Sequence, residues 1–348
     1  MKRFLLLTLV VILFFSCKKE YVPRTIESIS IQEFKIDSSS IRAIHPIDEN
    51  TLYYAGSKGD IGKTIDGGKT WSKFIINYQD SITPHFRSIA SNGKDLFTLS
   101  IANPALLYKI SNENKHVVYT EIHEKVFYDS MKFFTDGIHG IAVGDPTENC
   151  PSIILTSDGG TTWTKLPCDT LPKFENGEAF FAASNTNISI VNSTVWIGSG
   201  GSKARILKST DFGNTWEVYN TPIIQGDGPQ GIYSIDFYDE NNGIAIGGNY
   251  AKPEDNCANK AITKDGGKTW TLVADNQNPN YKSCVQYIPN TNGKEIIAVG
   301  KTGISFSNDG GITWKGISKD SYYSIQFVNQ QMAWLSGHEK IGKLLLSN

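Results

Sequence analysis

The chain has 348 residues, of which 39% are hydrophobic and 20% are charged, proportions that are typical of a globular protein. The net charge is -2 at pH 7. Because such a chain lacks a basic field for a phosphate backbone, we do not expect nucleic acid as a partner. The length allows one large domain or two ordinary ones.

The first segment predicts export. Residues 1–16 contain two basic residues followed by an apolar stretch from Phe4 to Phe15, which is short for a membrane span and typical of a signal peptide. Cys17 follows at once, and the order FFSC before KKE resembles the end of a bacterial lipoprotein signal. The resemblance implies cleavage before Cys17 and lipid on that cysteine. A plain signal peptide with an incidental cysteine is the alternative.

The domain boundaries follow from this interpretation. We expect residues 17–24 to form a lipidated polar tether and residues 25–348 to form one folded domain. The protein would then lie in the bacterial cell envelope, facing the periplasm or the cell surface, and would touch the lipid bilayer only through the Cys17 anchor.

Five copies of a motif with the pattern S/T-x-D-G-G-x-T-W occur along the chain, with Phe212 replacing one glycine. They are TIDGGKTW at 64–71, TSDGGTTW at 156–163, STDFGNTW at 209–216, TKDGGKTW at 263–270 and SNDGGITW at 307–314. The Asp carboxylate can bond to following backbone N–H groups, the glycines can supply positive φ, and the Trp can pack as a new strand begins. The motif therefore predicts a stapled hairpin turn, with a structural role and not a catalytic one.

This pattern resembles the Asp-box, or BNR repeat, of sialidases, sortilins and photosystem II assembly factor-like proteins. The steps between the Asp residues are 92, 53, 54 and 44, and 92 corresponds to two units if one copy is lost near residues 108–119. Each motif follows an apolar strand, a polar turn and a strand that ends in Gly. We therefore expect an all-β fold, a seven-bladed β-propeller of four-stranded antiparallel blades.

The two chain ends complete this prediction. The last unit stops at LLLSN without a fourth strand, and SISIQEFKI at 28–36 alternates as an outer strand should. The N-terminal strand would close the ring in a velcro arrangement. A count of six or eight blades would leave a strand missing or unused.

Seven expected inner strands share a pattern in which a first residue is followed by a small and then an apolar residue. The first residues are Arg42, Arg87, Asp129, Glu178, Tyr233, Ser283 and Tyr323. They would surround the central channel at one mouth, opposite the motif turns, as a ligand pocket with both charge signs and aromatic faces. The alternative is a satisfied ring of ion pairs that plugs the channel.

Long loops are expected at the same mouth, and these are the places where binding residues gather on a rigid scaffold. They add Asp145, Arg205 and Asn249 to the predicted ligand-binding set of Arg42, Arg87, Asp129, Glu178, Tyr233 and Tyr323. Only five Arg occur in the chain, and Arg42, Arg87 and Arg205 are the three outside the signal and tether.

Four cysteines follow Cys17, and an exported chain permits disulfides. Strand directions at the mouth pair Cys150 with Cys168 and Cys257 with Cys284. No cysteine pair has CxxC spacing and the six His lack metal-ligand spacing, so we expect no metal and no cofactor.

Two resemblances suggest two functions. Sialidases of this fold use three Arg, a Tyr and Glu pair and an acid Asp, which implies Glu178, Tyr233 and Asp129 as catalytic residues acting on an acidic sugar. The segments FFTDGIHGIAVGDP at 133–146 and FYDENNGIAIGG at 237–248 resemble the photosystem II assembly factor-like group, whose members bind protein segments. We favour a monomeric, non-catalytic binding or assembly module that takes a protein segment or a carbohydrate at the channel mouth. The alternative is a sialidase-like glycoside hydrolase.

Overall fold

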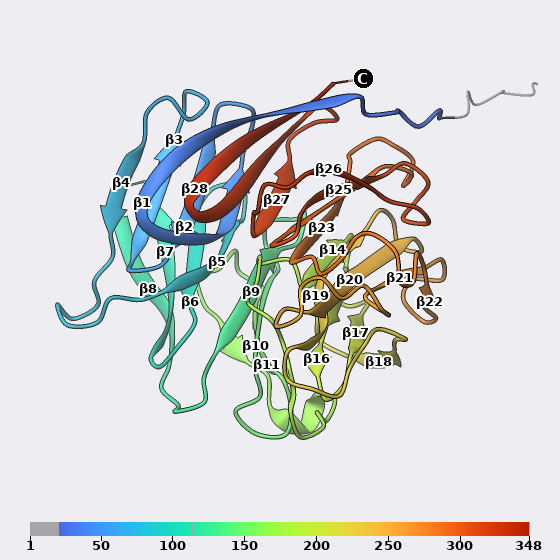
Figure 1. Cartoon of the computed structure of the whole chain (residues 1–348). Coiled ribbons are helices and arrows are strands. Elements are labelled where there is room, and N and C mark those ends of the chain that lie inside the picture. Colours follow the sequence, from blue (N-terminus) through green and yellow to red (C-terminus); the bar gives the residue numbers. More distant parts are fainter. Residues whose placement is uncertain (1–20, 113, 348) are drawn as a thin grey trace, which may run out of the picture.

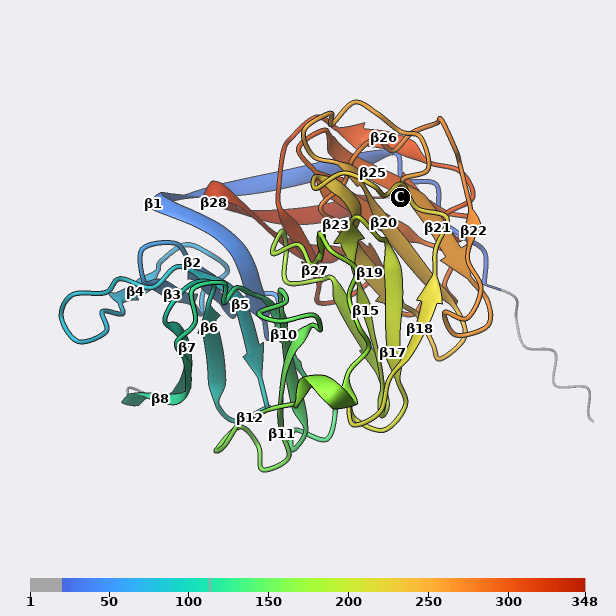
Figure 2. The same cartoon turned by 90° about the horizontal axis from the view of Figure 1, so that it is seen from below.

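The computed structural model describes residues 21–112 and 114–347, which form β-strands and one short 3-10 helix, η1 (Cys168–Thr170). Figures 1 and 2 show the strands grouped in sheets, with both described chain ends on the same side. The predicted signal peptide at 1–16 and the lipidated Cys17 lie outside the described residues. In the described part of the chain, no helix has the length and apolar character needed to cross a membrane.

Four of the sheets have four antiparallel strands each. The first has β5 (Phe86–Ser91), β6 (Leu96–Ser100), β7 (Ala105–Ser111) and β8 (Asn114–Glu121). The second has β9 (Tyr128–Phe133), β10 (Gly140–Gly144), β11 (Ser152–Thr156) and β12 (Thr164–Lys165). The third has β14 (Ile188–Val191), β15 (Thr194–Gly198), β17 (Arg205–Ser209) and β18 (Glu217–Asn220). The fourth has β23 (Cys284–Tyr287), β24 (Ile296–Gly300), β25 (Gly303–Ser307) and β26 (Lys315–Ser318).

Two sheets have six strands each. One contains β13 (Glu178–Ala179), β16 (Gly200–Gly201), β19 (Gln230–Phe237), β20 (Gly243–Asn249), β21 (Lys260–Thr263) and β22 (Thr271–Leu272). The other contains β27 (Ser324–Phe327), β28 (Met332–Ser347), β1 (Ser28–Pro46), β2 (Leu52–Gly56), β3 (Asp60–Thr64) and β4 (Ser72–Ile75).

The propeller therefore has six blades, and the prediction of seven is wrong. The reason is that β1 is one long strand which pairs with β28 through its first part and with β2 through its second part. The units counted as first and last in the sequence thus share a single six-stranded sheet. Four-stranded antiparallel blades are confirmed for the four sheets of that size.

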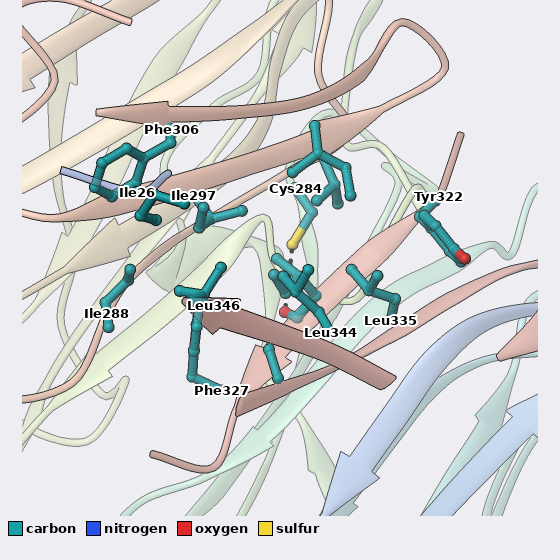
Figure 3. Packing of buried hydrophobic residues seen from close by; sticks show 14 residues of the cluster. Ile26, Cys284, Ile288, Ile297, Phe306, Tyr322, Phe327, Leu335, Leu344 and Leu346 are labelled. Carbon is teal, nitrogen blue, oxygen red and sulfur yellow. Dashed lines mark hydrogen bonds between the residues drawn. The ribbon is translucent and has the colours of Figure 1, made fainter. Parts of the chain in front are cut away.

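The chain ends are held together by this shared sheet. Ser28–Lys35 of β1 pairs antiparallel with residues 340–347 of β28, and Figure 1 shows the two strands side by side. Beneath them lies a core cluster that joins Ile26 and Leu346 to Phe306 and Ile297, drawn in Figure 3. Burial of apolar side chains from both chain ends in one cluster makes the closure part of the core.

The five motif copies form tight turns, which we call the motif turns. In the first, the Asp66 carboxylate accepts hydrogen bonds from the Thr70 backbone N–H at 2.9 Å and from the Thr70 hydroxyl at 2.6 Å. The Gly68 N–H donates to the Thr64 hydroxyl at 2.9 Å. The Thr70 hydroxyl lowers the pKa of Asp66 to about 2. Equivalent carboxylate bonds occur around Asp158, Asp211, Asp265 and Asp309.

One face of the propeller carries all five motif turns, and we call it the turn face. Each motif turn bonds to a loop that joins two earlier strands of its own sheet; for example, the Gly159 N–H donates to the Ile138 carbonyl at 2.9 Å. Neighbouring sheets are also linked there, as when the Asn92 side chain donates to the Gly159 carbonyl at 2.8 Å. The opposite face, at which the inner strands begin, is the cavity face.

Candidate functional site

A cavity of about 620 Å³ opens on the cavity face, at the predicted channel mouth. Six of the seven expected ring positions line it, namely Arg42, Arg87, Asp129, Tyr233, Ser283 and Tyr323. The first four lie within β1, β5, β9 and β19, and the last two immediately precede β23 and β27. These six residues therefore lie together at the channel mouth, and five of them are charged or aromatic; their role in ligand binding stays a prediction.

The floor of the cavity is a segment that the sequence did not predict. Residues 180–187 leave β13, cross the central channel and enter β14. Asn185 bonds to neighbouring inner strands, accepting from the Met131 N–H and donating to the Ile89 carbonyl, both at 2.9 Å. On its other side, the Ser184 hydroxyl donates to the Ser283 carbonyl at 2.7 Å. We call this segment the plug.

The plug separates two cavities along the channel. Ala182 and Ala183 line the cavity on the cavity face, whereas Asn185 and Thr186 line a smaller one of about 210 Å³ toward the turn face. The channel is thus not an open pore through these residues. A ligand at the mouth meets a floor made of plug backbone.

Arg42 and Arg87 stand at this floor with few partners. Arg42 donates to the Ala183 carbonyl at 3.2 Å, and its guanidinium carbon lies 4.1 Å from the centroid of the Tyr323 ring. Arg87 donates to the Ala182 carbonyl at 3.5 Å. Burial and the positive charge of Arg42 lower the pKa of Arg87. No ion pair among the described residues includes either arginine, and both residues line the cavity.

Aromatic rings form one wall of the cavity. Phe181 of the plug stacks on Tyr233 with parallel rings and centroids 4.0 Å apart. Tyr281 meets Tyr233 edge to face at 4.9 Å, and the more exposed Tyr250 approaches it at 6.3 Å. The Tyr233 hydroxyl donates to the Pro229 carbonyl at 2.8 Å, which holds the ring in place. Such rigid aromatic faces favour apolar or planar ligand groups.

Two carboxyl groups complete the lining. Asp129 is fully buried, and its oxygens have no hydrogen-bond partner among the described residues. Burial, followed by the nearby charge of Asp145, raises the pKa of Asp129 well above its usual range. Burial raises the pKa of Asp145 to about 6, although its carboxylate accepts the Phe180 N–H at 2.8 Å. The raised pKa favours the neutral form of Asp129, and the arginines carry the positive charge at the floor.

Three residues of the predicted ligand-binding set lie away from the cavity, which is a correction. Glu178 and Arg205 bind each other at 2.9 and 2.6 Å in a bidentate ion pair. Glu178 was expected to open an inner strand, but β13 pairs with β16 in a six-stranded sheet, and the first strand of the neighbouring four-stranded sheet is β14. Asn249 is buried in β20, and its side-chain oxygen accepts the Ala251 N–H at 2.9 Å.

The geometry also separates the residues required by the sialidase-like hypothesis. Arg205 does not join Arg42 and Arg87, since its guanidinium is bound to Glu178 and to the Lys173 carbonyl. The proposed catalytic Glu178 is therefore held in an ion pair, and Tyr233 and Asp129 line the cavity without it. Within the described ranges, no three His, Cys, Asp or Glu side chains gather closely enough to hold a metal ion.

Several cavity residues were not predicted. Phe127, Phe181, Tyr281 and Lys301 line it, but each lies outside the regular strands. The steps of 53 and 54 residues between motif Asp residues both exceed the shortest step of 44, and the first of them contains the plug.

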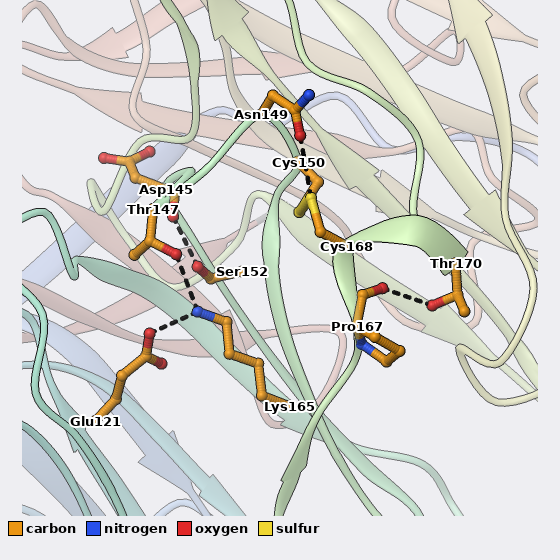
Figure 4. Close-up of a disulfide and its surroundings, with 10 residues drawn as sticks. All are labelled: Glu121, Asp145, Thr147, Asn149, Cys150, Ser152, Lys165, Pro167, Cys168 and Thr170. Carbon is orange, nitrogen blue, oxygen red and sulfur yellow. Dashed lines mark hydrogen bonds and ion pairs between the residues drawn. A yellow bond between two sulfur atoms is a disulfide. The ribbon is translucent and has the colours of Figure 1, made fainter.

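One of the two predicted disulfides is present. Cys150 and Cys168 are bonded, with Cα atoms 5.7 Å apart, close to the loop that carries Asp145 (Figure 4). Lys165 lies nearby and binds Glu121 at 2.5 Å. The predicted pair of Cys257 and Cys284 is wrong, since both are free cysteines. Cys284 lies in the core among strands at the chain closure, whereas Cys257 is exposed.

Comparison with solved structures confirms the propeller fold. A structure of YCF48 bound to a D1 peptide matches with a TM-score of 0.66 and 15% identity, over 94% of this chain and 100% of that one. YCF48 from Cyanidioschyzon merolae matches with a TM-score of 0.64 and 15% identity, over 90% and 98%. The WD40 repeats of RRP9 match with a TM-score of 0.65 and 10% identity, over 93% and 100%. No protein-family model and no curated protein sequence matches the chain.

Proposed function

We propose that the chain is a non-catalytic binding module that takes a segment of another protein in the cavity on the cavity face. The observation that carries this proposal is the position of Arg42 and Arg87. Two guanidinium groups with no carboxylate partner among the described residues lie side by side on the floor of a cavity with aromatic walls. Like charges that lie together without an ion-pair partner favour an anionic ligand.

The cavity geometry supports a short segment as the ligand. A volume of about 620 Å³ falls in the range of small-ligand pockets and accommodates a few side chains, not a folded domain. The arginines would take a carboxylate of the segment, and the wall of Phe181, Tyr233 and Tyr281 would take a neighbouring apolar side chain. A propeller of matching fold, YCF48, has been solved with a bound peptide, which adds support for a peptide ligand.

The sialidase-like hydrolase has less support from this geometry than the binding module has. Hydrolysis of a glycoside requires a pair of carboxyl groups free to act on the bond. Glu178 is paired with Arg205, and the Asp145 carboxylate accepts a backbone N–H. An assembly or binding role uses the cavity without any of these groups.

The proposal includes export and a lipid anchor at Cys17 in a bacterial cell envelope. The basic and apolar segment at 1–16 followed by Cys17 carries this part. Mass analysis of the N-terminal peptide from membranes should find a lipid-modified Cys17, and Cys17→Ser should release the chain from the membrane fraction. An unmodified Cys17 would contradict the anchor and leave the binding proposal standing.

Binding can be tested with a phage-displayed random peptide library selected on the folded domain. Arg42→Gln and Arg87→Gln should each weaken the selected peptides by about tenfold or more, since each removes a charge-assisted contact. Lys203→Gln is the matched control, because Lys203 is an exposed cation of the same face outside the cavity. Unchanged affinity in both arginine variants would reject the site. If parallel arrays select acidic glycans and no peptide, the ligand is a carbohydrate and not a protein segment.

A further inference from the structure

The described N-terminal residues are bound to the turn face. Arg24 donates to the Glu295 carboxylate from Nε at 2.9 Å and from Nη2 at 2.6 Å, and its backbone N–H donates to the same carboxylate at 2.8 Å. The Tyr21 hydroxyl donates to Glu295 as well. The Glu295 side chain is fully buried, so the contact is part of the folded domain and not a passing surface pair.

The elements around Arg24 identify the face. Glu295 lies at the end of the turn between β23 and β24, and the Gln330 carbonyl that accepts from Arg24 lies in the turn between β27 and β28. Asn308 of the fifth motif turn donates to the Arg24 carbonyl at 3.1 Å. All three positions belong to the turn face, and Ile26 continues from there into the core cluster of the chain closure (Figure 3).

The length of chain before this contact limits where an anchor can be. Only four residue steps separate Cys17 from Tyr21, and an extended chain covers at most about 14 Å in four steps. A five-residue strand such as β24 spans roughly 17 Å between the two faces of the propeller. A lipid on Cys17 therefore enters the bilayer next to the turn face and cannot reach around to the cavity face.

An independent observation concerns exposed isoleucines. Ile47, Ile65, Ile138 and Ile312 are exposed by 56%, 66%, 50% and 53%, and each lies in a turn of the turn face. Val22, which follows Tyr21 in the chain, is 81% exposed. A single exposed isoleucine needs no explanation, but four at the tips of turns on one face, next to a proposed anchor, suit the boundary between lipid headgroups and acyl chains.

We propose that the turn face lies on the lipid bilayer that holds Cys17, and that the cavity with Arg42 and Arg87 faces away from the membrane. This inference rests on the proposed lipid anchor. The bilayer covers the isoleucine tips, and the short chain before Tyr21 holds the propeller in that orientation. The cavity is then presented to a segment of a partner that lies outside the plane of the membrane.

The orientation can be measured with nitroxide labels on the full lipidated chain in vesicles of phosphatidylethanolamine and phosphatidylglycerol. Single cysteines replace Ile65, Ile312 or Ile122 in a background of Cys257→Ser and Cys284→Ala. Ile122 is the matched control, because it is an isoleucine exposed by 79% just after β8, at the cavity face. Labels at 65 and 312 should be reached by oxygen in the bilayer and shielded from a water-soluble nickel complex, whereas the label at 122 should be open to nickel.

The same labels on the Cys17→Ser chain in solution show whether the shielding comes from the membrane. There, positions 65 and 312 should be open to nickel. Nickel access at 65 and 312 in the lipidated chain would overturn the orientation while the anchor stands. Shielding of positions 65 and 312 from both oxygen and nickel would point to a protein partner on the turn face. That result would also overturn the proposed orientation. If mass analysis finds no lipid on Cys17, the anchor proposal fails and this inference fails with it.

Discussion

Arg205 and Glu178 form a bidentate ion pair in which the Glu178 side chain is fully buried and the Arg205 side chain is 15% exposed. The Ser199 hydroxyl donates to the same carboxylate at 2.7 Å. The sialidase-like hypothesis requires both residues at the channel mouth. In the structure they instead join β17 to β13. Their separation from Arg42 and Arg87 leaves the cavity with two arginines and not three.

Loss of one member of this pair should be costly. Arg205→Met leaves a buried carboxylate without its cation and should lower the free energy of unfolding by about 3 to 5 kcal/mol in urea titrations. The double variant Arg205→Met with Glu178→Gln should recover most of that loss. Peptide affinity of the folded double variant should match that of the wild type, since neither residue lines the cavity. A large loss of affinity would place the pair in the binding site.

The plug should depend on Asn185. Asn185→Leu leaves the Met131 N–H and the Ile89 carbonyl without their partners and should destabilise the fold by about 2 to 4 kcal/mol. Asn187 is the matched control, because its buried side-chain amide has no partner among the described residues. Asn187→Leu should be neutral or stabilising. Equal effects of the two substitutions in urea unfolding would show that the bonds of Asn185 do not hold the plug.

The first motif turn should tolerate no side chain at its second glycine. Gly68 has φ of +92°, and a Cβ there would lie 2.5 Å from the Phe34 ring of β1. Gly93 has φ of +89° with nothing within 4 Å of such a Cβ. Gly93→Ala should cost about 1 kcal/mol from backbone strain alone, and Gly68→Ala about 1 to 3 kcal/mol more from overpacking. Similar unfolding midpoints for both variants would contradict close packing of Phe34 on this turn.

Asp145 should make stability depend on pH. Because burial raises its pKa to about 6 from 3.8, the folded state binds the proton more tightly than the unfolded state. The resulting penalty is absent below pH 3.8, develops as the pH rises and is complete above pH 6. Asp145→Asn should thus be more stable than the wild type at pH 8, on the order of 2 kcal/mol, and equal to it at pH 3.5. The exposed Asp169→Asn is the control, and thermal unfolding across pH gives the comparison.

Reduction of the disulfide should weaken the domain. The bond of Cys150 with Cys168 closes a loop of 18 residues, and its loss should reduce the free energy of unfolding by about 3 kcal/mol. Unreduced peptide mapping should show this linkage and two free thiols at Cys257 and Cys284. Cys257→Ser should leave stability unchanged because the residue is exposed. A linkage of Cys257 with Cys284 would contradict the structure.

Local sequence was sufficient for the turns, for the outer strand at 28–36 and for six positions that line the mouth. A motif such as residues 64–71 satisfies its own polar groups, so its conformation needs no distant partner. The alternation in 28–36 identified the strand that pairs with β28, because the period of side chains along a strand is local. Arg42, Arg87, Tyr233 and Tyr323 were found for the same reason, as equivalent positions of repeated strands.

Only the tertiary structure decided which residues meet. The sheet count depended on β1 running unbroken from one pairing into another, and continuity of hydrogen bonding between distant segments is not visible in a local pattern. The plug replaced an expected inner strand because its bonds go to Met131, Ile89 and Ser283, which lie 54 to 99 residues away along the chain. With the plug held in the channel by those long-range bonds, Glu178 and Arg205 lie outside the cavity, and Arg42 and Arg87 line it.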